Sequence, residues 1–444
     1  MKVYIETLGC PKNFNDTQAA EAFLIKEGFE IADSPEEADH IIVNTCGFIN
    51  DAKKESINKI FEMAELKDQG KTLTVSGCLS QRYSSELTEE MPEVDLFIGV
   101  NDYERLPGLL KEISDGRSTG RNRSSESCEY ASQLPLLERN IKKGTYTATL
   151  RIAEGCDNCC AYCVIPSIRG GYRSKSMEDI VTEAKYLAEE GIKEIILIAQ
   201  DVTNYGIDLY GRFMLPELLR KLVKISGIEW IRLMYCYEDR ITDELIKVMA
   251  EEPKICHYID VPIQHSSDHT LKEMKRRSTG SSIRNTISRL RASMPDIAIR
   301  TTLIVGFPGE TEEDFDDLLD FVEEERFQRL GVFAYSQEEG TPAGDREDQI
   351  PEDVKEMRLD QIMRTQLDIS YQHNQALIGS VLDVLVEDRD EDGSYIGRSQ
   401  YDAPEIDNSV VFTSDRDLKP GDMVKVFIND AFDYDLAGYE KEAE

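Results

Sequence analysis

The stretch RIAEGCDNCCAYCVIPSIRGGY, from Arg151 to Tyr172, follows a run that is typical of a strand, Thr147–Ala153. It places Cys156, Cys160 and Cys163 in a C-x3-C-x2-C pattern. Three thiolates at this spacing can hold three irons of a [4Fe–4S] cubane and leave the fourth iron without a protein ligand. An open iron can bind a small chelating molecule, so such a cluster can carry out chemistry as well as transfer electrons.

The same loop contains a further thiol, Cys159, which permits a second interpretation. The pairs Cys156–Cys159 and Cys160–Cys163 can be read as the two C-x2-C pairs of a zinc site. Structural zinc sites place a longer loop between such pairs. Here the pairs are adjacent, and one short loop would have to wrap all the thiols around one ion. The cluster is therefore favoured, and we expect Cys159 to be a bystander or weak modulator.

Length and charge narrow the class of protein. The chain has 444 residues, enough for about two to four domains with cores of their own. It has no apolar run of membrane-span length, and its start, MKVYIETLGC, favours a strand over a signal peptide, so we expect a soluble cytoplasmic protein with no membrane partner. In the cytosol, ten cysteines indicate metal binding or catalysis rather than disulfides. A net charge of −35 argues against general binding to nucleic-acid phosphates, although it leaves room for a local basic patch.

Residues 1–115 alternate between strand-like and helix-like segments, which predicts a small doubly wound parallel sheet. The expected strands are Val3–Leu8, Ile41–Asn44, Thr72–Ser76 and Leu96–Val100, and the expected helices are Asp16–Lys26 and Ala52–Leu66. A polar segment rich in Ser, Arg and Gly follows at 116–139 and predicts a linker. Cys128 lies within it without an obvious partner.

Residues 140–372 repeat the strand–helix alternation and predict an open, partial (β/α)6 barrel. In α/β barrels the functional groups gather at the C-terminal ends of the strands. A long amphipathic helix, Val354–Gln375, is expected to lead out of the barrel. The expected strands are Thr147–Ala153, Lys193–Ala199, Trp230–Tyr235, Tyr258–Ile263, Ala298–Val305 and Leu330–Tyr335.

In residues 373–444 the strand–helix alternation gives way to a pattern of short strands, which predicts a small all-β barrel of OB-like type. Short alternating runs are separated by Asp-Gly, Pro and Gly turns. The expected strands are Val381–Val386, Tyr395–Ser399, Val410–Thr413 and Met423–Ile428. This segment carries 18 acidic and 6 basic residues, a net charge of −12.

A second set of cysteines lies in the N-terminal part of the chain. Cys10, Cys46 and Cys78 each follow an expected parallel strand. Because the carboxyl ends of parallel strands meet at one edge of a sheet, the three thiols can converge there. Gly9, Gly47 and Gly77 flank them and would let the backbone approach a bulky cluster. Three unrelated buried thiols are the alternative, since free cysteine is often a core residue.

Ordered motifs along nearly the whole chain resemble the methylthiotransferase family of radical S-adenosylmethionine enzymes. Tyr162, before the third cysteine of the C-x3-C-x2-C loop, matches the aromatic residue of the radical motif. The resemblance implies a flavodoxin-like methylthiotransferase domain at 1–115, a radical SAM core at 140–372 and a TRAM domain at 373–444. The remaining motifs are LGCPKN (Leu8–Asn13), NTCGFI (Asn44–Ile49), SGCL (Ser76–Leu79), IPSIRGGYRS (Ile165–Ser174), AQDVTNYG (Ala199–Gly206), YIDVPIQHSSD (Tyr258–Asp268), RTTLIVGFPGET (Arg300–Thr311), FAYSQEEGT (Phe333–Thr341), R-x4-APEID (Arg398–Asp407), KPGDMVKV (Lys419–Val426) and DAFDYDLAG (Asp430–Gly438).

Within the family, LGCPKN and APEID resemble the branch that adds a methylthio group to the β-carbon of an aspartate in small-subunit ribosomal protein twelve. The alternative branch is the tRNA adenosine methylthiotransferases. A C-terminal domain that binds tRNA should carry Lys and Arg side chains that contact the phosphates. The C-terminal domain of this chain is acidic, which suits binding to a basic ribosomal protein. We therefore do not expect RNA binding to dominate. A plain iron–sulfur carrier is a third interpretation, but carriers usually saturate their irons with four thiolates.

The resemblance also implies cofactors, partners and site residues. The cofactors are two [4Fe–4S] clusters per chain and S-adenosylmethionine, and the second partner is an electron donor such as flavodoxin or ferredoxin. Cys156, Cys160 and Cys163 would hold the radical cluster, and Cys10, Cys46 and Cys78 the sulfur-supplying cluster. The candidate cofactor-binding side chains are Tyr162, Gln200, Asp201, Gln264 and Arg300.

Some of these side chains, and several residues near them, have a structural alternative. Asp201 can be a helix N-cap. Arg300 can pair with a buried acid, and His265, next to Gln264, is more often a structural residue than a ligand. Gly306, Pro308 and Gly309 can be explained by turn formation alone.

Overall fold

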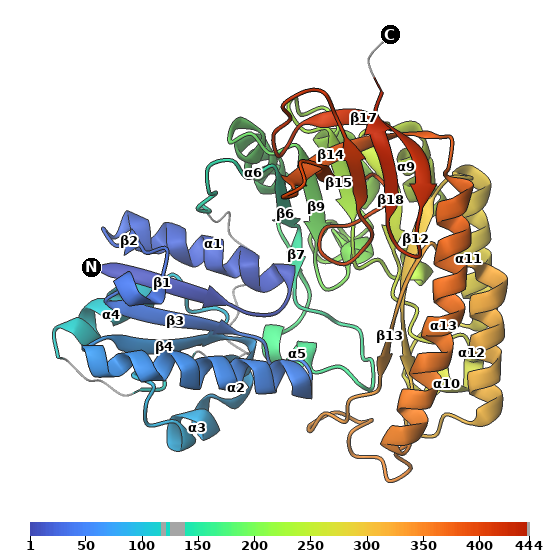
Figure 1. The fold of residues 1–444 in the computed structure, drawn as a ribbon. Helices are drawn as coiled ribbons and strands as arrows, with labels where there is room; N and C mark the ends of the chain where they lie inside the picture. The colour runs from blue at the N-terminus through green and yellow to red at the C-terminus, as the bar shows by residue number, and fades with distance from the viewer. Residues whose placement is uncertain (117–120, 125–137, 442–444) are drawn as a thin grey trace.

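A computed structural model describes residues 1–116, 121–124 and 138–441 of the chain (Figure 1). Three parts follow one another: a parallel sheet with helices, an open α/β barrel and a small closed β-barrel. The predicted fold class is therefore confirmed. Most of the predicted linker, including Cys128, lies outside the described residues. Within the described ranges, no helix combines the length and apolar character needed to cross a membrane.

The N-terminal part is a five-stranded parallel sheet of order β2-β1-β3-β4-β5. This is the order of flavodoxin-like sheets, whose ligand sites lie beyond the carboxyl ends of the strands. The strands are β1 (Lys2–Thr7), β2 (Glu30–Ile31), β3 (His40–Thr45), β4 (Thr72–Gly77) and β5 (Leu96–Phe97). The helices are α1 (Pro11–Lys26), η1 (Pro35–Glu37), α2 (Asn50–Ala64), η2 (Glu65–Gln69), α3 (Cys78–Glu90) and α4 (Leu106–Ser114).

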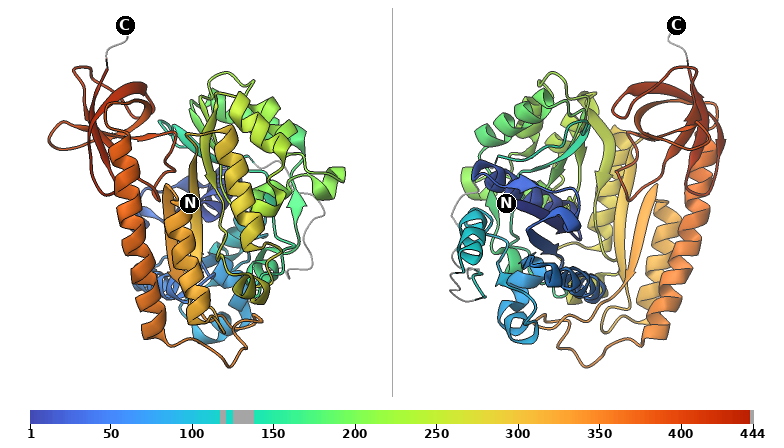
Figure 2. Two further views of the ribbon diagram at one scale, coloured as in Figure 1. Left: turned by 90° about the vertical axis from the view of Figure 1, so that its right-hand side faces the viewer. Right: turned by 60° about the vertical axis from the view of Figure 1, so that its left-hand side comes forward.

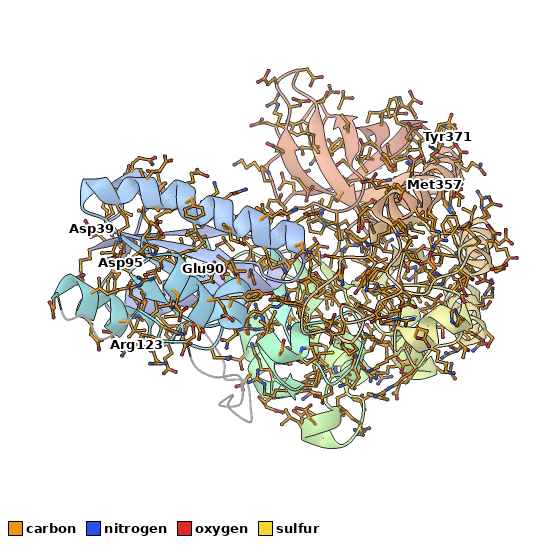
Figure 3. The ribbon with its side chains drawn as sticks, turned by 90° about the horizontal axis from the view of Figure 1, so that it is seen from below. Asp39, Glu90, Asp95, Arg123, Met357 and Tyr371 are labelled. Atoms are coloured by element: carbon orange, nitrogen blue, oxygen red, sulfur yellow. The ribbon has the colours of Figure 1, made fainter. Side chains whose placement is uncertain are left out.

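The orientation of this sheet is visible from two labelled residues. Asp39 and Asp95 directly precede β3 and β5, and both lie at the end of the sheet that is remote from the barrel (Figure 3). The opposite edge, where the strands end, therefore faces the barrel. One correction concerns α1, which begins at Pro11 rather than at Asp16. Proline is well suited to the first turn of a helix because its backbone is already fixed there.

The central part is a six-stranded parallel sheet of order β13-β12-β11-β10-β9-β6, open between its first and last strands, as predicted. Its strands are β6 (Thr147–Arg151), β9 (Glu194–Ile198), β10 (Trp230–Leu233), β11 (Ile255–Asp260), β12 (Ala298–Val305) and β13 (Arg329–Ala334). A separate antiparallel pair is formed by β7 (Ala153–Glu154) and β8 (Arg173–Ser174).

Helices cover the outer face of this sheet and enclose the largest apolar core of the molecule. The helices of the central part are α5 (Ile165–Arg169), α6 (Met177–Glu189), η4 (Val202–Asn204), α7 (Ile207–Tyr210), α8 (Leu215–Leu222), η5 (Glu238–Arg240), α9 (Asp243–Glu251), α10 (Asp268–Glu273), α11 (Gly280–Ser293), α12 (Glu312–Glu325) and α13 (Glu352–Ala376), of which α5 lies next to the N-terminal sheet. The long helix α13 runs along the barrel to the C-terminal domain (Figure 2). Met357 and Tyr371 are exposed on it (Figure 3).

Two strand predictions in the barrel need correction. The run Thr147–Ala153 divides into β6 and β7, because the chain leaves the sheet at Ile152. The strand predicted at Tyr258–Ile263 spans Ile255–Asp260 instead. Pro262 has no N–H to give to a sheet, so the apolar run beyond Asp260 continues outside the strand.

The C-terminal part is a closed barrel of order β14-β15-β16-β18-β17. Its strands are β14 (Val381–Arg389), β15 (Tyr395–Ser399), β16 (Val410–Thr413), β17 (Met423–Ala431) and β18 (Leu436–Glu440). The strand β18 was not among the predicted ones. It closes the barrel by pairing in parallel with β16 and antiparallel with β17.

The C-terminal barrel packs into the concave face of the open barrel. Leu385 and Ala403 share an apolar cluster with Trp230, the first residue of β10. Beside them, Arg398 donates to Glu194 at 2.5 Å, and the other carboxylate oxygen of Glu194 accepts from Arg232 at 2.8 Å. Because Glu194 begins β9, this contact lies at the start of the strands. The carboxyl ends of the strands are left to face the N-terminal sheet.

Candidate active site

The N-terminal thiols follow three neighbouring strands of one parallel sheet. Cys10 precedes α1 after β1, Cys46 follows β3, and Cys78 is the first residue of α3 after β4. In the sheet β1 pairs with β3 and β3 with β4, both in parallel. The three loops therefore leave the same edge of the sheet side by side.

The backbone around these thiols is packed too closely for larger residues. At Gly9, where φ is +89°, a Cβ atom would lie 2.7 Å from the Cβ of Cys46 and 3.1 Å from its Sγ. At Gly47 a Cβ atom would lie 2.7 Å from the Cα of Leu79, the residue after Cys78. Glycine is therefore needed to bring the three loops together, as the sequence predicted.

Electrostatics also shows that the three thiols are neighbours. Burial raises the pKa of Cys78 to about 11, and the charges of Cys10 and Cys46 act in the same direction. Burial also raises the pKa of Cys46, with Cys10 adding to the shift. The structure thus brings together all three members of the predicted set. Iron binding would have to displace the protons of these thiols.

The second set of thiols lies in the loop between β7 and α5. Cys156 N donates to Gly170 O at 3.1 Å, and Cys163 N donates to Cys160 O at 3.1 Å, so the loop is held at both ends. Burial raises the pKa of Cys156 to about 11 and that of Cys163 to about 12, and in both cases Cys160 contributes. Cys159 is exposed and points its sulfur toward Asp157 O at 3.8 Å, in agreement with a bystander.

The donor chemistry of both sets suits iron–sulfur clusters. Each set offers three thiols, and each thiolate of a cubane binds a different iron. Among the described residues, no three His, Cys, Asp or Glu side chains converge around the position of a single metal ion. The fit to a cluster rests on the thiols themselves and on the close approach of backbone that the glycines permit.

Buried charges connect the two cysteine loops. Arg169, at the end of α5, lies close to both Asp16 of α1 and Glu154 of β7, at 2.8 and 3.4 Å. Arg151 contacts the same two carboxylates at 2.6 and 2.7 Å. Burial alone would raise the pKa of Glu154, but Arg169 and Arg151 lower it to about 2. Glu154 therefore remains ionised at neutral pH, which a buried carboxylate does only when it is well paired.

Arg169 also reaches the N-terminal thiols. Its Nη2 donates to the Oδ1 of Asn13 at 3.0 Å and to the Sγ of Cys78 at 3.4 Å. Hydrogen bonds to sulfur are among the features that set the reduction potential of a cluster. Sequence reasoning missed this residue. The available signal was its place in IPSIRGGYRS, six residues after Cys163.

Two of the predicted cofactor-binding residues lie directly beside this network or the barrel loop. Gln200 follows β9 and donates from Nε2 to Glu154 at 2.7 Å, while its buried Oε1 has no partner among the described residues. Tyr162 packs near Met274 and Phe307, and burial, followed by the charge of Cys160, raises its pKa well above the usual value. Both are placed to contact a molecule held at the barrel cysteines.

The other predicted side chains mainly have structural partners. Asp201 accepts from Asn204 N as the N-cap of η4, which is the alternative considered above. Arg300 donates to Asp260 at 2.9 Å and lies 3.4 Å from Asp407, again the structural alternative. These contacts give no support to cofactor binding by either side chain.

The region around Gln264 also has a structural role. Gln264 has a φ of +73° and bonds through its backbone to β12. His265 is completely buried and accepts from Ser267 N at 3.0 Å. Gly306 and Gly309 both have positive φ, and side chains of the segment after β13 fill the space beside them, so turn formation and packing account for them. Pro308 lies between the two glycines in the same turn.

A cavity of about 160 Å³ opens beside the barrel cysteines. Its wall includes Cys160, whose Sγ lies 3.6 Å from the hydroxyl of Tyr237. The lining also carries two exposed cations, Lys275 and Arg277, and one exposed acid, Asp239. The lining residues are Asn158, Cys159, Cys160, Tyr237, Asp239, Lys275, Arg276, Arg277 and Ser278.

Three family models match successive parts of the chain. Residues 2–99 match the model described as Uncharacterized protein family UPF0004. Residues 150–322 match the Radical SAM superfamily. Residues 378–439 match the TRAM domain. Each match falls within one of the domains predicted from the sequence.

Relatives of known name match over nearly their full length. Ribosomal protein uS12 methylthiotransferase RimO of Desulforamulus reducens is 50% identical over 436 residues, covering 97% of this chain and 98% of the relative. The protein of the same name from Lachnoclostridium phytofermentans is 48% identical over 441 residues and 99% of both chains. That of Acetivibrio thermocellus is 50% identical over 446 residues and 98% of both.

Solved structures share the fold at low identity. The radical S-adenosylmethionine methyltransferase TsrM from Kitasatospora setae, with cobalamin and a [4Fe-4S] cluster bound, has a TM-score of 0.54 at 16% identity over 77% of both chains. The cobalamin-dependent S-adenosylmethionine radical enzyme OxsB, with aqua-cobalamin and S-adenosylmethionine bound, has a TM-score of 0.52 at 15% identity, over 82% of this chain and 56% of that chain. At such identities the likeness concerns the fold alone.

Proposed function

The chain belongs to the ribosomal protein uS12 methylthiotransferase (RimO) family, and from this membership we propose that it transfers a methylthio group to the β-carbon of an aspartate in ribosomal protein uS12. It is a radical SAM enzyme, with S-adenosylmethionine and [4Fe–4S] clusters as cofactors. The observation that carries the proposal is the pairing of two sets of three thiols on facing edges of the N-terminal sheet and the barrel, joined through Arg169.

We assign the barrel cysteines, Cys156, Cys160 and Cys163, to the cluster that binds S-adenosylmethionine. Cys10, Cys46 and Cys78 would hold the second cluster. When bound, these groups supply the electron, the hydrogen-abstracting radical and the methylthio sulfur.

The chain's own residues position these groups and exclude water. The burial of Cys46 and Cys78 in one set, and of Cys156 and Cys160 in the other, limits the access of water to reactive species. Arg169 holds a positive charge against the sulfur of Cys78 and so stabilises its deprotonated form. Gln200 is fixed through Glu154 with its carbonyl oxygen left to accept a hydrogen bond. The C-terminal barrel closes the start of the strands, which confines a substrate to their carboxyl ends.

The surface of the C-terminal barrel supports a basic protein as its partner. Of the six basic side chains there, Arg398 is buried against Glu194 and the exposed Arg389, Arg416 and Lys425 are paired with acids, while the exposed Lys419 and Lys441 form no ion pair with a described residue. The turn between β14 and β15 exposes a run of acids from Asp388 to Asp392 with one arginine among them. Such a surface repels phosphates and attracts a cationic protein.

Two exposed cations at the cavity near Cys160 support docking of an acidic one-electron carrier such as flavodoxin or ferredoxin. Lys275 and Arg277 are exposed there, and within the described ranges neither forms an ion pair. On a chain with a net charge of −35, two unpaired cations beside a cluster ligand provide local attraction for an acidic donor.

Charge reversal tests this docking site. The double variant Lys275→Glu/Arg277→Glu should lower the rate of S-adenosylmethionine cleavage with a reduced flavodoxin or ferredoxin and leave the rate with dithionite unchanged. The double variant Lys185→Glu/Lys224→Glu, exposed elsewhere on the barrel, is the matched control. An equal effect of both double variants would exclude a specific site.

Anaerobic reconstitution tests the main proposal. The protein is loaded with iron and sulfide, its iron is counted, and a peptide from the uS12 loop is followed by mass spectrometry in the presence of S-adenosylmethionine. We expect about eight irons per chain and a gain of one methylthio group on aspartate. Modification of tRNA instead of the peptide would transfer the function to the related tRNA enzymes. About four irons would reject the assignment of the N-terminal set.

The buried free thiols suit a reducing compartment, and we propose a cytoplasmic location.

A further inference from the structure

One buried cation in the described part of the chain has no anionic partner. Lys12, in the first turn of α1, is 8% exposed, yet no carboxylate of the described residues lies within ion-pair distance of its ammonium group. The other buried lysines and arginines of the described ranges, such as Arg169 and Lys175, each have a carboxylate partner. The contact that Lys12 makes is with an aromatic ring, since its Nζ lies 3.6 Å from the centroid of Tyr235.

Lys12 lies between the two cysteine sets. It follows Cys10 by two residues, on the sheet edge that faces the barrel. Tyr235 follows the end of β10 by two residues. The hydroxyl of Tyr237, further along the same loop, lies 3.6 Å from Cys160. The ammonium group therefore occupies the region where a molecule in contact with both clusters would have to lie.

The surroundings hold the two partners in place without neutralising the charge. Tyr235 has a positive φ of +59°, and its N–H donates to Asp260 at 2.9 Å. Glu154 is near enough to feel the charge of Lys12, but its oxygens are occupied by Arg151, Arg169 and Gln200. An aromatic face compensates only part of the hydration that a buried ammonium loses. The ammonium group of Lys12 would therefore be stabilised further by an anionic ligand.

We propose that Lys12 binds the side-chain carboxylate of the acidic residue that the enzyme modifies. This inference rests on the proposed function and names the group that selects the target. In aspartate the β-carbon is bonded directly to the carboxyl carbon, so an anchor on the carboxylate also fixes the carbon that reacts. Because Cys10 is two residues away, the anchor and the sulfur-supplying cluster are held by the same turn of the chain.

A carboxylate is also present on S-adenosylmethionine, so the experiment must separate the two sources. Binding of a labelled uS12 loop peptide to the reconstituted protein is measured by fluorescence anisotropy, with the target aspartate intact and replaced by asparagine. Binding of S-adenosylmethionine is measured in parallel by calorimetry. The variants are Lys12→Met, which keeps the stem over Tyr235 and removes the charge, and Lys12→Arg, which keeps the charge. Lys26→Met, an exposed lysine at the other end of α1, is the matched control.

The wild type should prefer the aspartate peptide to the asparagine peptide by about tenfold or more, as expected for a charge-assisted hydrogen bond. Lys12→Met should weaken binding of the aspartate peptide by about ten- to a hundredfold and abolish the preference, while binding of the asparagine peptide and of S-adenosylmethionine stays within about twofold. Lys12→Arg should keep most of the preference, and Lys26→Met all of it. Iron content and circular dichroism verify that each variant is folded.

Two results would overturn the inference. Lys12→Met could retain the preference for aspartate, or it could weaken S-adenosylmethionine instead of the peptide, which would assign the ammonium to the cofactor. A different result would show that the proposed function is wrong while the inference about Lys12 is right. In that case the wild type discriminates aspartate from asparagine in binding, which supports the role of Lys12, but adds no methylthio group to the peptide.

Discussion

The guanidinium of Arg169 donates to the Sγ of Cys78 at 3.4 Å, across the boundary between the barrel and the N-terminal sheet. Arg169 ends the helix that follows the barrel cysteine loop, and Cys78 belongs to the other set of thiols. The same guanidinium pairs with Asp16 and Glu154. One side chain therefore connects the two cysteine loops and anchors the interface between the two domains.

Replacement of Arg169 by methionine should destabilise this interface. It would leave Asp16 and Glu154 buried with Arg151 as their shared cation, and loss of one partner of a buried ion pair costs about 3–5 kcal/mol. Urea unfolding should show this loss, and the iron count after reconstitution should fall mainly at the N-terminal set. Arg284→Met removes an exposed pair with Glu324 and should cost less than about 1 kcal/mol. Equal losses in the two variants would contradict a special role for Arg169.

The two cysteine sets should be separable by mutation. Cys10→Ala should reduce the iron content by about half and stop methylthio transfer, while cleavage of S-adenosylmethionine continues at the barrel cluster. Cleavage is followed by the release of 5′-deoxyadenosine. Cys159→Ala is the control, because this thiol is exposed, and it should retain full iron content and both activities. Loss of cleavage in a folded Cys10→Ala protein would reject the division of labour between the sets.

Stability should depend on pH through His265. Burial lowers the pKa of His265 to about 3 in the folded protein, against about 6.5 in the unfolded chain. Between these values the unfolded state binds one more proton, so the free energy of unfolding decreases as the pH falls below about 6.5, by about 1.4 kcal/mol per pH unit. The variant His265→Gln should lack this contribution. The wild type should therefore lose its advantage over the variant between pH 6.5 and pH 4, measured by urea unfolding, and a constant difference would contradict the assignment.

The C-terminal barrel should detach when Arg398 is replaced by methionine. Arg398 is buried and shares Glu194 with Arg232, so its removal should cost about 3–5 kcal/mol. Limited proteolysis should then release the segment that begins after α13 more quickly. The matched variant Arg416→Met breaks an exposed pair with Glu440 on the same barrel, and proteolysis should proceed as in the wild type. Unchanged proteolysis of Arg398→Met would show that apolar packing alone holds the barrel.

Local pattern predicted the positions of the thiols well. Cys10, Cys46 and Cys78 could be expected to meet because each follows a β-branched run, and parallel strands end at one edge. The strands Ala298–Val305 and Tyr395–Ser399 were predicted to the residue. The strand β18 was missed because its sequence, LAGYE, contains a glycine and no β-branched residue, so its own pattern gives no strand signal although it pairs with both β16 and β17.

Residues that act between domains could not be found in this way. Arg169 and Lys12 both lie in quoted motifs, but their partners Cys78 and Tyr235 are far away in sequence and belong to the opposite domain. Asp201 and Arg300 follow or lie within strands of the barrel and so suggested cofactor binding. Their observed partners, Asn204 and Asp407, are a local cap and a residue of the C-terminal barrel. Spacing gives the position of a side chain along its element but not the group that it meets across an interface.

The first turns of α1 combine Lys12, Asn13 and Asp16 directly behind Cys10. In a helix each inserted residue rotates everything after it by about 100°, so these side chains can change neighbours only together. An insertion or deletion within the segment LGCPKNFND would therefore displace all of these side chains at once. In the same way, a chimera that joined this barrel to the N-terminal sheet of another protein would exchange Lys12 and Asp16 in a single step, and Tyr235 and Arg169 would then meet new partners.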